Sequence, residues 1–168
     1  LLLLVFTSNP CKAEVAVYNV TDFGAIGDGL HDNTAAFAEC MSALVAGGGG
    51  RMYLPTGVYE GRIEVPAVDT LTRWMTVEIV GDVEPTPTFG TVGVMQFNRN
   101  GTFVQSLATS GAAVISVSAE RGTFSGVYVV VRNLNIRTYD NPAIGGVDLG
   151  NAQQCKVENV LINTAVYD

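Results

Sequence analysis

The sequence predicts an all-β protein, a β-solenoid of stacked coils that a single α-helix precedes. Three observations lead to this fold class. Apolar residues recur at helical spacing in one early segment, at about residues 32–46. After residue 50 the apolar period changes to two, in short runs separated by turn residues. Near the end, a stretch of sequence repeats itself after 26 residues, a length typical of stacked units.

The composition limits the size of the protein and its partners. The 168 residues, of which 48% are hydrophobic, suffice for one domain with a substantial core. Nine basic residues against 16 acidic ones give a formal net charge of −7, and the basic residues are scattered. The basic residues therefore form no continuous positive surface that could bind a nucleic-acid backbone, and we expect no nucleic-acid partner. An acidic surface also repels an anionic polymer unless a local basic groove or a metal ion intervenes.

The first 13 residues, LLLLVFTSNPCKA, have the pattern of the back half of a secretory signal peptide. Cys11 and Ala13 are small residues suitably placed for cleavage after Ala13. The apolar run Leu1–Phe6 is far too short to span a bilayer. We expect a secreted or cell-surface protein without membrane association after signal removal, with residues 14–168 as the N-terminal part of a single domain. A disordered or strand-like tail is the alternative.

The early helix is expected over about residues 32–46. Asp32 is predicted as its N-cap, because a carboxylate accepts hydrogen bonds from the free N–H groups of the first turn. The glycines at 47–50 are expected to end it, because glycine adopts positive φ without a Cβ clash. The apolar stripe of this helix comprises Phe37, Cys40, Met41, Leu44 and Val45.

Short β-strands are predicted on both sides of the helix. The alternating stretch AEVAVYNV precedes it, and the other strands follow it. The Pro-rich stretch VEPTPTFG, residues 83–90, is predicted as a loop. The runs predicted as strands after the helix are RMYLP, GRIEV, TVEIVG, AAVISVS and GVYVVV.

The repeat aligns RNLNIRT, residues 132–138, with ENVLINT, residues 158–164. Stacked coils place equivalent residues one above the other at about 4.8 Å, the spacing of neighbouring strands. Ile136 should then lie directly over Ile162, and the aligned asparagines should form a ladder of side-chain hydrogen bonds. The matched pairs are Val131 and Val157, Asn133 and Asn159, Leu134 and Val160, Ile136 and Ile162, and Thr138 and Thr164.

The stretch VTDFGAIGDGLHDNT, residues 20–34, combines three aspartates with the chain's single histidine. Its glycines suit tight turns, so a purely structural role accounts for it. A calcium site formed by Asp22, Asp28 and Asp32 is the functional alternative, since hard cations prefer several oxygen ligands. His31 is expected as an exposed loop residue, and no Cys/His spacing is typical of a zinc site. We therefore expect neither a metal nor a cofactor.

Three cysteines are too few to define a disulfide framework. Cys11 would leave with the signal peptide. Cys40 and Cys155 lie in apolar patterns, where a free cysteine behaves as a small hydrophobic residue. A Cys40–Cys155 bridge is the alternative in an oxidising compartment.

Many residues around the helix follow one fixed order. They run from Asp22 to Thr34 as DFGAIGDGLHDNT and continue after the helix with Pro55, Gly57 and Tyr59. This pattern resembles the N-terminal signature of the pectate-lyase-like superfamily, which includes polygalacturonases, rhamnogalacturonases and phage tailspike proteins. The resemblance implies a right-handed parallel β-helix with an N-terminal capping α-helix. It also implies that the aspartates and glycines of the signature are scaffold residues.

The same resemblance indicates where a polygalacturonase would carry its catalytic acids. Its first catalytic motif reads roughly N-T-D-G-I-D-I, followed by a strand and G-D-D, and inverting hydrolysis needs carboxylates spaced to admit a water. Residues 146–149 of this chain parallel G-I-D-I, but Gly145 occupies the position of the catalytic aspartate. Ala165, Val166 and Tyr167 occupy the G-D-D positions. We expect the catalytic residues beyond a chain truncated at its C-terminus; a different site is the alternative.

Three acids of the given chain are candidates for a catalytic role: Asp148, Glu158 and Asp140. Because side chains alternate along a strand, Asp148 and Glu158 are expected to point outward. They could share a sheet face in adjacent coils, with Asp140 in a nearby loop. The alternative is a solvated face, which outward acids on a solenoid usually form.

Aromatic residues and arginines are further candidates for sugar contacts. Arg132 and Arg137 could meet uronate carboxylates, but their spacing predicts opposite faces of a strand. Packing is the alternative for the aromatic residues. The aromatic candidates are Tyr59, Trp74, Tyr128 and Tyr139.

The sequence thus predicts the N-terminal portion of a secreted β-helix protein that acts on a polysaccharide. By resemblance it is a glycosidase or lyase of the pectin-degrading type, and its partner is a pectin-like or other glycan. A non-enzymatic tailspike-like or adhesin-like glycan-binding protein is the alternative, as is a purely structural β-solenoid.

Overall fold

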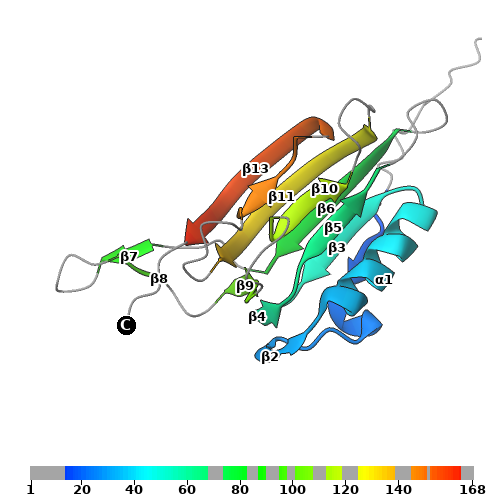
Figure 1. Cartoon of the computed structure of the whole chain (residues 1–168). Coiled ribbons are helices and arrows are strands. Elements are labelled where there is room, and N and C mark those ends of the chain that lie inside the picture. The colour runs from blue at the N-terminus through cyan, green and yellow to red at the C-terminus, as the bar shows by residue number, and fades with distance from the viewer. Residues whose placement is uncertain are drawn as a thin grey trace, which may run out of the picture.

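The computed structural model describes residues 14–67, 74–82, 87–89, 95–97, 101–107, 113–118, 125–138, 145–150 and 152–163. Most of these residues are in β-strands, and the strands of the two larger sheets pair in parallel. In Figure 1, strands from distant parts of the chain lie side by side, and one helix, α1 (Thr34–Ala46), flanks them. The predicted mostly-β fold is confirmed for the described residues.

The strands form three parallel stacks. We call each segment that contributes one strand to successive stacks a circuit, and each strand pairs with its equivalent in the next circuit. The first stack contains β1 (Val17–Asn19), β3 (Gly50–Leu54), β6 (Met75–Gly81) and the first halves of β11 (Ser125–Arg137) and β13 (Ala152–Asn163). The second contains β2 (Asp28–Asp32), β4 (Gly57–Glu60), β9 (Thr102–Gln105) and the second halves of β11 and β13. The third contains β5 (Ile63–Pro66), β10 (Ile115–Ser118) and β12 (Val147–Asp148).

The register of β11 against β13 confirms the predicted repeat. Ile136 pairs with Ile162, and Leu134 pairs with Val160. Asn159 Nδ2 donates to Asn133 Oδ1 at 3.4 Å, which is the predicted asparagine contact between circuits. Thr164 lies outside the described residues, so its match with Thr138 stays a prediction.

The asparagines also bend β11 and β13 from one stack into the next. Asn133 and Asn159 have φ of 57° and 50°, in the left-handed region that asparagine tolerates better than most residues. The bend shifts by one position which residues of β11 point inward. Inward apolar residues are two positions apart on either side of the bend but three apart across it, from Val131 to Leu134.

The bend overturns the prediction for the two arginines. Arg132 lies between buried Val131 and the bend, whereas Arg137 lies between buried Ile136 and Thr138. Both side chains therefore lie on the outside of the stacks instead of on opposite faces. Strict alternation fails because one residue is used in the bend.

The amphipathic helix α1 packs against the first circuit of strands. It contacts β1, β3, β5 and the 3₁₀ helix η1 (Val20–Phe23). As predicted, its apolar stripe faces inward, with Phe37, Cys40, Met41 and Leu44 buried and Val45 partly buried. The helix thereby shields the apolar side of the first circuit from water.

The start of α1 differs from the prediction by one residue. Asn33, not Asp32, is the N-cap, although the Asp32 carboxylate does accept the Thr34 N–H at 2.9 Å. Asn33 is 2% exposed, and its amide bonds the Ile26 N–H and the carbonyls of Ile26, His31 and Glu60. This position needs donors as well as an acceptor, and a carboxylate has no donor.

The last three of the four glycines after α1 adopt the predicted positive φ, and the first does not. Gly47 has φ of −72°, whereas Gly48, Gly49 and Gly50 have φ of 92°, 107° and 149°. A Cβ on Gly49 would come within 2.6 Å of the Thr76 carbonyl oxygen. The chain can therefore pass this closely under β6 only with glycine.

Two stretches expected to be irregular contain short strands. Within residues 83–90, β7 (Pro87–Phe89) pairs antiparallel with β8 (Met95–Phe97). Pro87 is the first residue of its strand, a position that proline tolerates. The signature stretch likewise contains β2, which pairs with β4. The sequence predicts irregular structure in both stretches because they are rich in turn residues, and it does not predict the short strands within them.

Both described cysteines are free, so the Cys40–Cys155 bridge is not formed. Cys40 is buried in α1, and burial raises the pKa of its thiol to about 11, with the charge of Asp22 adding to the effect. Cys155 is exposed on β13. Among the described residues, no helix has the length and hydrophobicity needed to cross a bilayer.

Candidate functional site

The third stack carries a row of polar side chains on its outer face. Glu64 pairs with Ser116, and Ser116 pairs with Asp148, so the three residues lie in register on β5, β10 and β12. Their strand neighbours Ile63 and Ile115 are fully buried, which directs the polar side chains outward. In Figure 1, β10 and β12 are drawn in front of β11, so the view looks onto this face.

Strand spacing sets the dimensions of the Glu64–Ser116–Asp148 row. Neighbouring strands lie about 4.8 Å apart, so the backbones of Glu64 and Asp148 are roughly 9.6 Å apart. Ser116 lies between them and offers a hydroxyl that both donates and accepts. A group lying over Ser116 would therefore have a carboxylate on each side.

One end of the row adjoins a small cavity with a volume of about 70 Å³. Glu64 and Ser116 line it together with Arg62, Thr34 and Ala38, so α1 forms one wall. The Arg62 N–H donates to Thr34 Oγ1 at 3.3 Å, which ties the start of β5 to the start of α1. Within the described part of the chain, the Arg62 guanidinium makes no ion pair.

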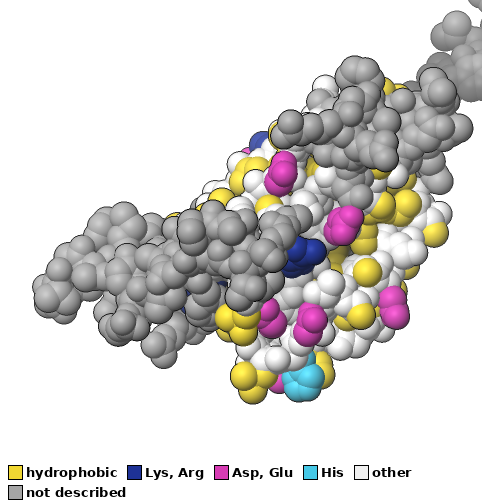
Figure 2. Space-filling model, viewed as in Figure 1, with side chains coloured by type: hydrophobic (Ala, Val, Ile, Leu, Met, Phe, Trp, Pro, Cys, Tyr) yellow, Lys and Arg dark blue, Asp and Glu magenta, His cyan; other side chains and the backbone are white. Residues whose placement is uncertain are grey.

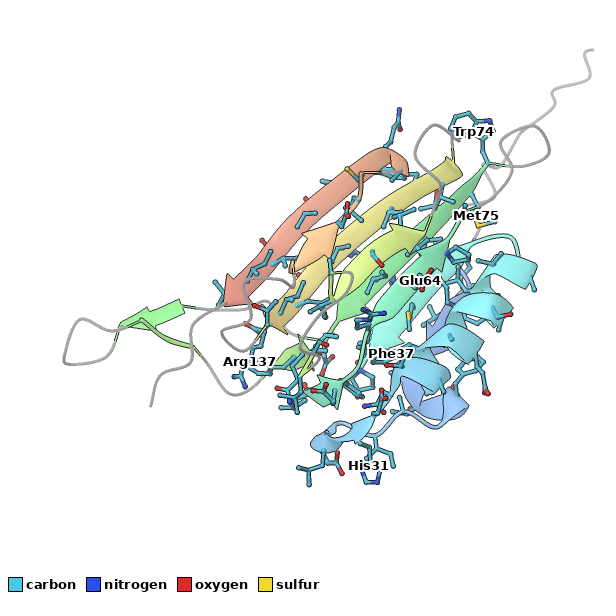
Figure 3. All side chains as sticks on the ribbon, in the orientation of Figure 1. His31, Phe37, Glu64, Trp74, Met75 and Arg137 are labelled. Carbon is cyan, nitrogen blue, oxygen red and sulfur yellow. The ribbon has the colours of Figure 1, made fainter. Side chains whose placement is uncertain are left out.

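The face is mixed in charge and in polarity. Figure 2 shows acidic and basic side chains among apolar ones, and Figure 3 places Glu64 near the middle of the view. Arg62 against Glu64 and Asp148 leaves one net negative charge at neutral pH. The row thus offers acceptors for hydroxyl groups and one cation for a carboxylate.

Two of the three predicted acids, Asp148 and Glu158, lie in different stacks. Asp148 lies in the row, and its Oδ1 accepts the Gly150 N–H at 3.0 Å. Glu158 lies on β13 of the first stack, where it pairs with Lys156 at 2.6 Å. The shared sheet face expected for Asp148 and Glu158 is therefore wrong, because the chain turns between β12 and β13, where the Ala152 N–H donates to the Leu149 carbonyl at 2.9 Å. Asp140 lies outside the described residues.

Sequence reasoning missed Glu64 and Ser116 as partners of Asp148. The alternation in GRIEV and AAVISVS does indicate that both side chains point outward. It does not indicate that they meet, because the loops between circuits differ in length. Glu64 and Ser116 are 52 positions apart, whereas Ser116 and Asp148 are 32 apart.

The outer face of the first stack carries a separate charged network. Glu78 Oε2 accepts from Arg51 Nε at 2.8 Å and from Arg132 at 3.1 Å. Asp82 accepts from the Tyr53 and Thr56 hydroxyls, both at 2.8 Å, and these bonds lower the pKa of Asp82. These acids are satisfied by neighbours, so the network is well suited to holding successive circuits together.

A further acid, Glu60, lies on the outer side of the second stack. Its Oε1 accepts the Leu107 N–H at 2.8 Å, while Oε2 is buried without a hydrogen-bond partner in the described structure. Burial raises the pKa of Glu60, and the charge of Asp32 adds to this, although bonds from Leu107 and Gln105 oppose it. No feature of the sequence singled out this residue.

The aspartates of the signature stretch serve the backbone. Asp28 Oδ1 accepts the N–H groups of Leu30 and His31, and these two bonds are the main cause of its pKa of about 2. The Asp28 carboxylate also contacts His31 Nδ1 at 2.6 Å, and His31 is exposed as predicted. Among the described residues, no three His, Cys, Asp or Glu gather as a metal-ligand set. The calcium alternative for Asp22, Asp28 and Asp32 therefore has no geometric support.

The aromatic candidates lie in different parts of the structure, one in the core and two on the surface. Tyr59 is 2% exposed and packs against Phe37 with ring centroids 6.2 Å apart, so it is a core residue. Trp74 and Tyr128 line one groove on another part of the surface. Tyr139 lies outside the described residues.

Comparisons with known proteins agree with this architecture. The family model for rhamnogalacturonase A/epimerase, pectate lyase-like, matches residues 17–168. Mannuronan C5-epimerase AlgE2 of Azotobacter vinelandii is 49% identical over 65 residues, which are 38% of this chain and 6% of that protein. Alginate lyase 7 of the same organism is 52% identical over 42 residues, 25% of this chain and 5% of that one. The chain thus spans only a small part of these relatives.

One further relative and one solved structure extend the comparison. Plasmin and fibronectin-binding protein A of Streptococcus pneumoniae R6 is 43% identical over 47 residues, 27% of this chain and 6% of that protein. The ORF18 protein of Geobacillus virus E2 aligns with a TM-score of 0.57 and 21% identity over 84% of this chain and 24% of that one. This structural likeness concerns the fold alone. Because the family model covers nearly the whole sequence, the chain belongs to the rhamnogalacturonase A/epimerase, pectate lyase-like family.

Proposed function

We propose that this chain is the N-terminal part of a secreted, polysaccharide-acting right-handed parallel β-helix protein with α1 as its end cap. The proposed activity is that of a glycosidase or lyase of the pectin-degrading type. Membership of the pectate lyase-like family supports it, as do relatives whose names state action on mannuronan and alginate. The leader-like residues 1–13 support export.

The observation that carries the proposal is the in-register Glu64–Ser116–Asp148 row beside Arg62. A polysaccharide crossing the strands of the third stack would meet these groups in succession. The two carboxylates accept hydrogen bonds from sugar hydroxyls, and Ser116 serves as donor or acceptor. The Arg62 guanidinium can bind the carboxylate of a uronic-acid unit in a bidentate manner.

The bond-breaking step is assigned to residues beyond position 168. The two acids of the row, Glu64 and Asp148, are exposed to solvent. The family motif for the catalytic aspartate is filled by Gly145. In this proposal the row binds and orients the sugar chain.

Affinity electrophoresis tests the proposal on the 168-residue protein. Gels containing polygalacturonate or alginate should retard it, while reducing-sugar assays on both polymers should stay blank. Arg62→Gln should lower the affinity at least about tenfold, because a buried or partly buried charge-assisted pair contributes about 1.5–3 kcal/mol. Asp148→Asn should change it less, because one acceptor oxygen remains and a charge that repels the polyanion is removed.

Lys156→Gln is the matched control, since it removes the same charge from the first stack. If Arg62→Gln and Lys156→Gln weaken retardation equally, the third stack is not the binding face. Robust turnover by the 168-residue protein would refute the assignment of catalysis to later residues.

The alternative is a binding protein without enzymatic activity. The match with plasmin and fibronectin-binding protein A is the observation that favours it. A protein extended beyond Asp168 that retains polysaccharide binding but never cleaves or epimerises any uronic-acid polymer would support this alternative.

A further inference from the structure

A groove separate from the proposed binding face crosses the starts of the first-stack strands. Its volume is about 590 Å³, within the roughly 300–1,000 Å³ range of small-ligand sites. Gly47–Gly50 form part of its lining, so backbone is accessible there without side chains. It shares no lining residue with the cavity beside Glu64.

Two aromatic residues line this groove. Trp74 directly precedes β6 and is 64% exposed, and Tyr128 lies on the adjacent strand β11, half-buried. Figure 3 shows Trp74 at the end of the molecule distant from His31 and Arg137. Covering an indole this open to water is favourable. A flat apolar surface that lies on the ring removes apolar area from water and adds packing contacts.

The remaining lining is mixed, with apolar side chains from Val15, Ala16 and Met75 beside a few polar ones, and it carries little charge. Thr76 and Gln154 provide a hydroxyl and an amide, and Tyr128 adds its phenol. Among the described residues that line the groove, Glu14 is the one carboxylate and none is a cation. A polyanion would therefore meet repulsion here, whereas a neutral ligand rich in hydroxyl groups would find acceptors and donors.

We infer that this groove is an accessory carbohydrate-binding site for neutral pyranose units, with Trp74 and Tyr128 as stacking platforms. One face of a pyranose carries C–H groups that pack on an aromatic ring, while its hydroxyls point to the rim. Gln154, Thr76 and Glu14 then bind these hydroxyls. The site goes beyond the proposed function, because it takes a different class of sugar on a different face.

Tryptophan fluorescence measures binding at this site without a label, because Trp74 is the single tryptophan of the chain. The 168-residue protein is titrated with cellotetraose, mannotetraose and β-1,4-galactotetraose while Trp74 emission is recorded, and with trigalacturonate in parallel. At least one neutral oligosaccharide should shift the emission saturably, in the millimolar range, at least fivefold more tightly than trigalacturonate. Tyr128→Ala, which keeps the reporter, should weaken that binding at least fivefold.

Tyr53→Phe changes an aromatic residue on the outer face elsewhere in the first stack and should leave the titration unchanged. The inference is overturned by the absence of any saturable shift, by equal or tighter binding of trigalacturonate, or by indifference to Tyr128→Ala. A shift that follows protein concentration in the absence of sugar would identify self-association and also overturn it. Trp74→Ala should leave retardation by polygalacturonate unchanged, which separates this test from that of the proposed function.

Discussion

Asn33 joins three backbone segments through one side chain. Its amide bonds Ile26 on both the N–H and the carbonyl, and it reaches the carbonyls of His31 and Glu60 at 2.8 and 3.1 Å. The sequence signature contains this asparagine, but a helix-capping rule assigned the cap to Asp32. The rule considers only the helix N–H groups, whereas here Asn33 also donates to the partly buried carbonyls of neighbouring segments.

Asn33→Ala should lower the free energy of unfolding by about 3 kcal/mol, because it removes four hydrogen bonds and leaves partly buried groups of Ile26 and His31 without these partners. Asn33→Asp should be comparably destabilising, since it places a carboxylate against three carbonyl oxygens. Urea unfolding measures both. Asp32→Asn, which retains an acceptor for the Thr34 N–H, is the control and should cost less than about 1 kcal/mol. Equal losses for Asn33→Ala and Asp32→Asn would contradict the assigned role.

Glu60 should make stability depend on pH. Burial raises its pKa above the ordinary value of 4.5, so the folded state binds the proton more tightly than the unfolded state does. Stability therefore falls as the pH rises from about that value through the raised pKa, and the loss persists at neutral pH. Glu60→Gln should therefore raise the Tm at pH 7 and leave it unchanged at pH 4. The gain in the free energy of unfolding at pH 7 should be less than about 1 kcal/mol.

Thermal unfolding at the two pH values measures this difference. Glu39→Gln, an exposed acid on α1, is the matched control. A Glu60→Gln variant that is less stable than the parent at pH 7 would show that the carboxylate is stabilising and that the argument from burial fails.

At the scale of the element, β11 depends on a residue that interrupts its alternation. Asn133 has φ of 57°, which a β-branched residue adopts only with strain. Asn133→Val should therefore destabilise the protein by about 2 kcal/mol more than Asn133→Gly, although both lose the bond to Asn159. Denaturant unfolding compares the two variants.

The same pair of substitutions at Asn159, with φ of 50°, should follow the same order. If the valine and glycine variants at Asn133 are equally stable, the bend does not require the left-handed conformation. The account of how the chain passes from one stack to the next would then be wrong.

The sequence predicts elements well where one local pattern dominates. The stripe from Phe37 to Leu44 predicts α1, and its burial follows. Alternation predicts β3, β5, β6 and β10, whose inward residues are apolar. It fails at Asn133, because a single left-handed residue changes the face of every residue after it.

At the scale of the whole molecule, the pairing of β11 with β13 is predictable and that of β5, β10 and β12 is not. The former follows a repeat of constant length, which aligns Ile136 with Ile162. The latter joins strands separated by loops of unequal length, so no period marks them. The candidate site depends on this second kind of pairing, which explains why the sequence identified Asp148 without its neighbours.

The stacking of circuits is tested most directly by a disulfide between successive circuits. Val129 pairs with Cys155, and register partners on neighbouring strands lie about 4.8 Å apart, within the usual disulfide range. Val129→Cys should therefore cross-link to Cys155 under mild oxidation, as peptide mass spectrometry detects. Val131→Cys, two residues along the same face and about 8 Å from Cys155, should not. Equal cross-linking at both positions, or at neither, would contradict the in-register stacking of the chain.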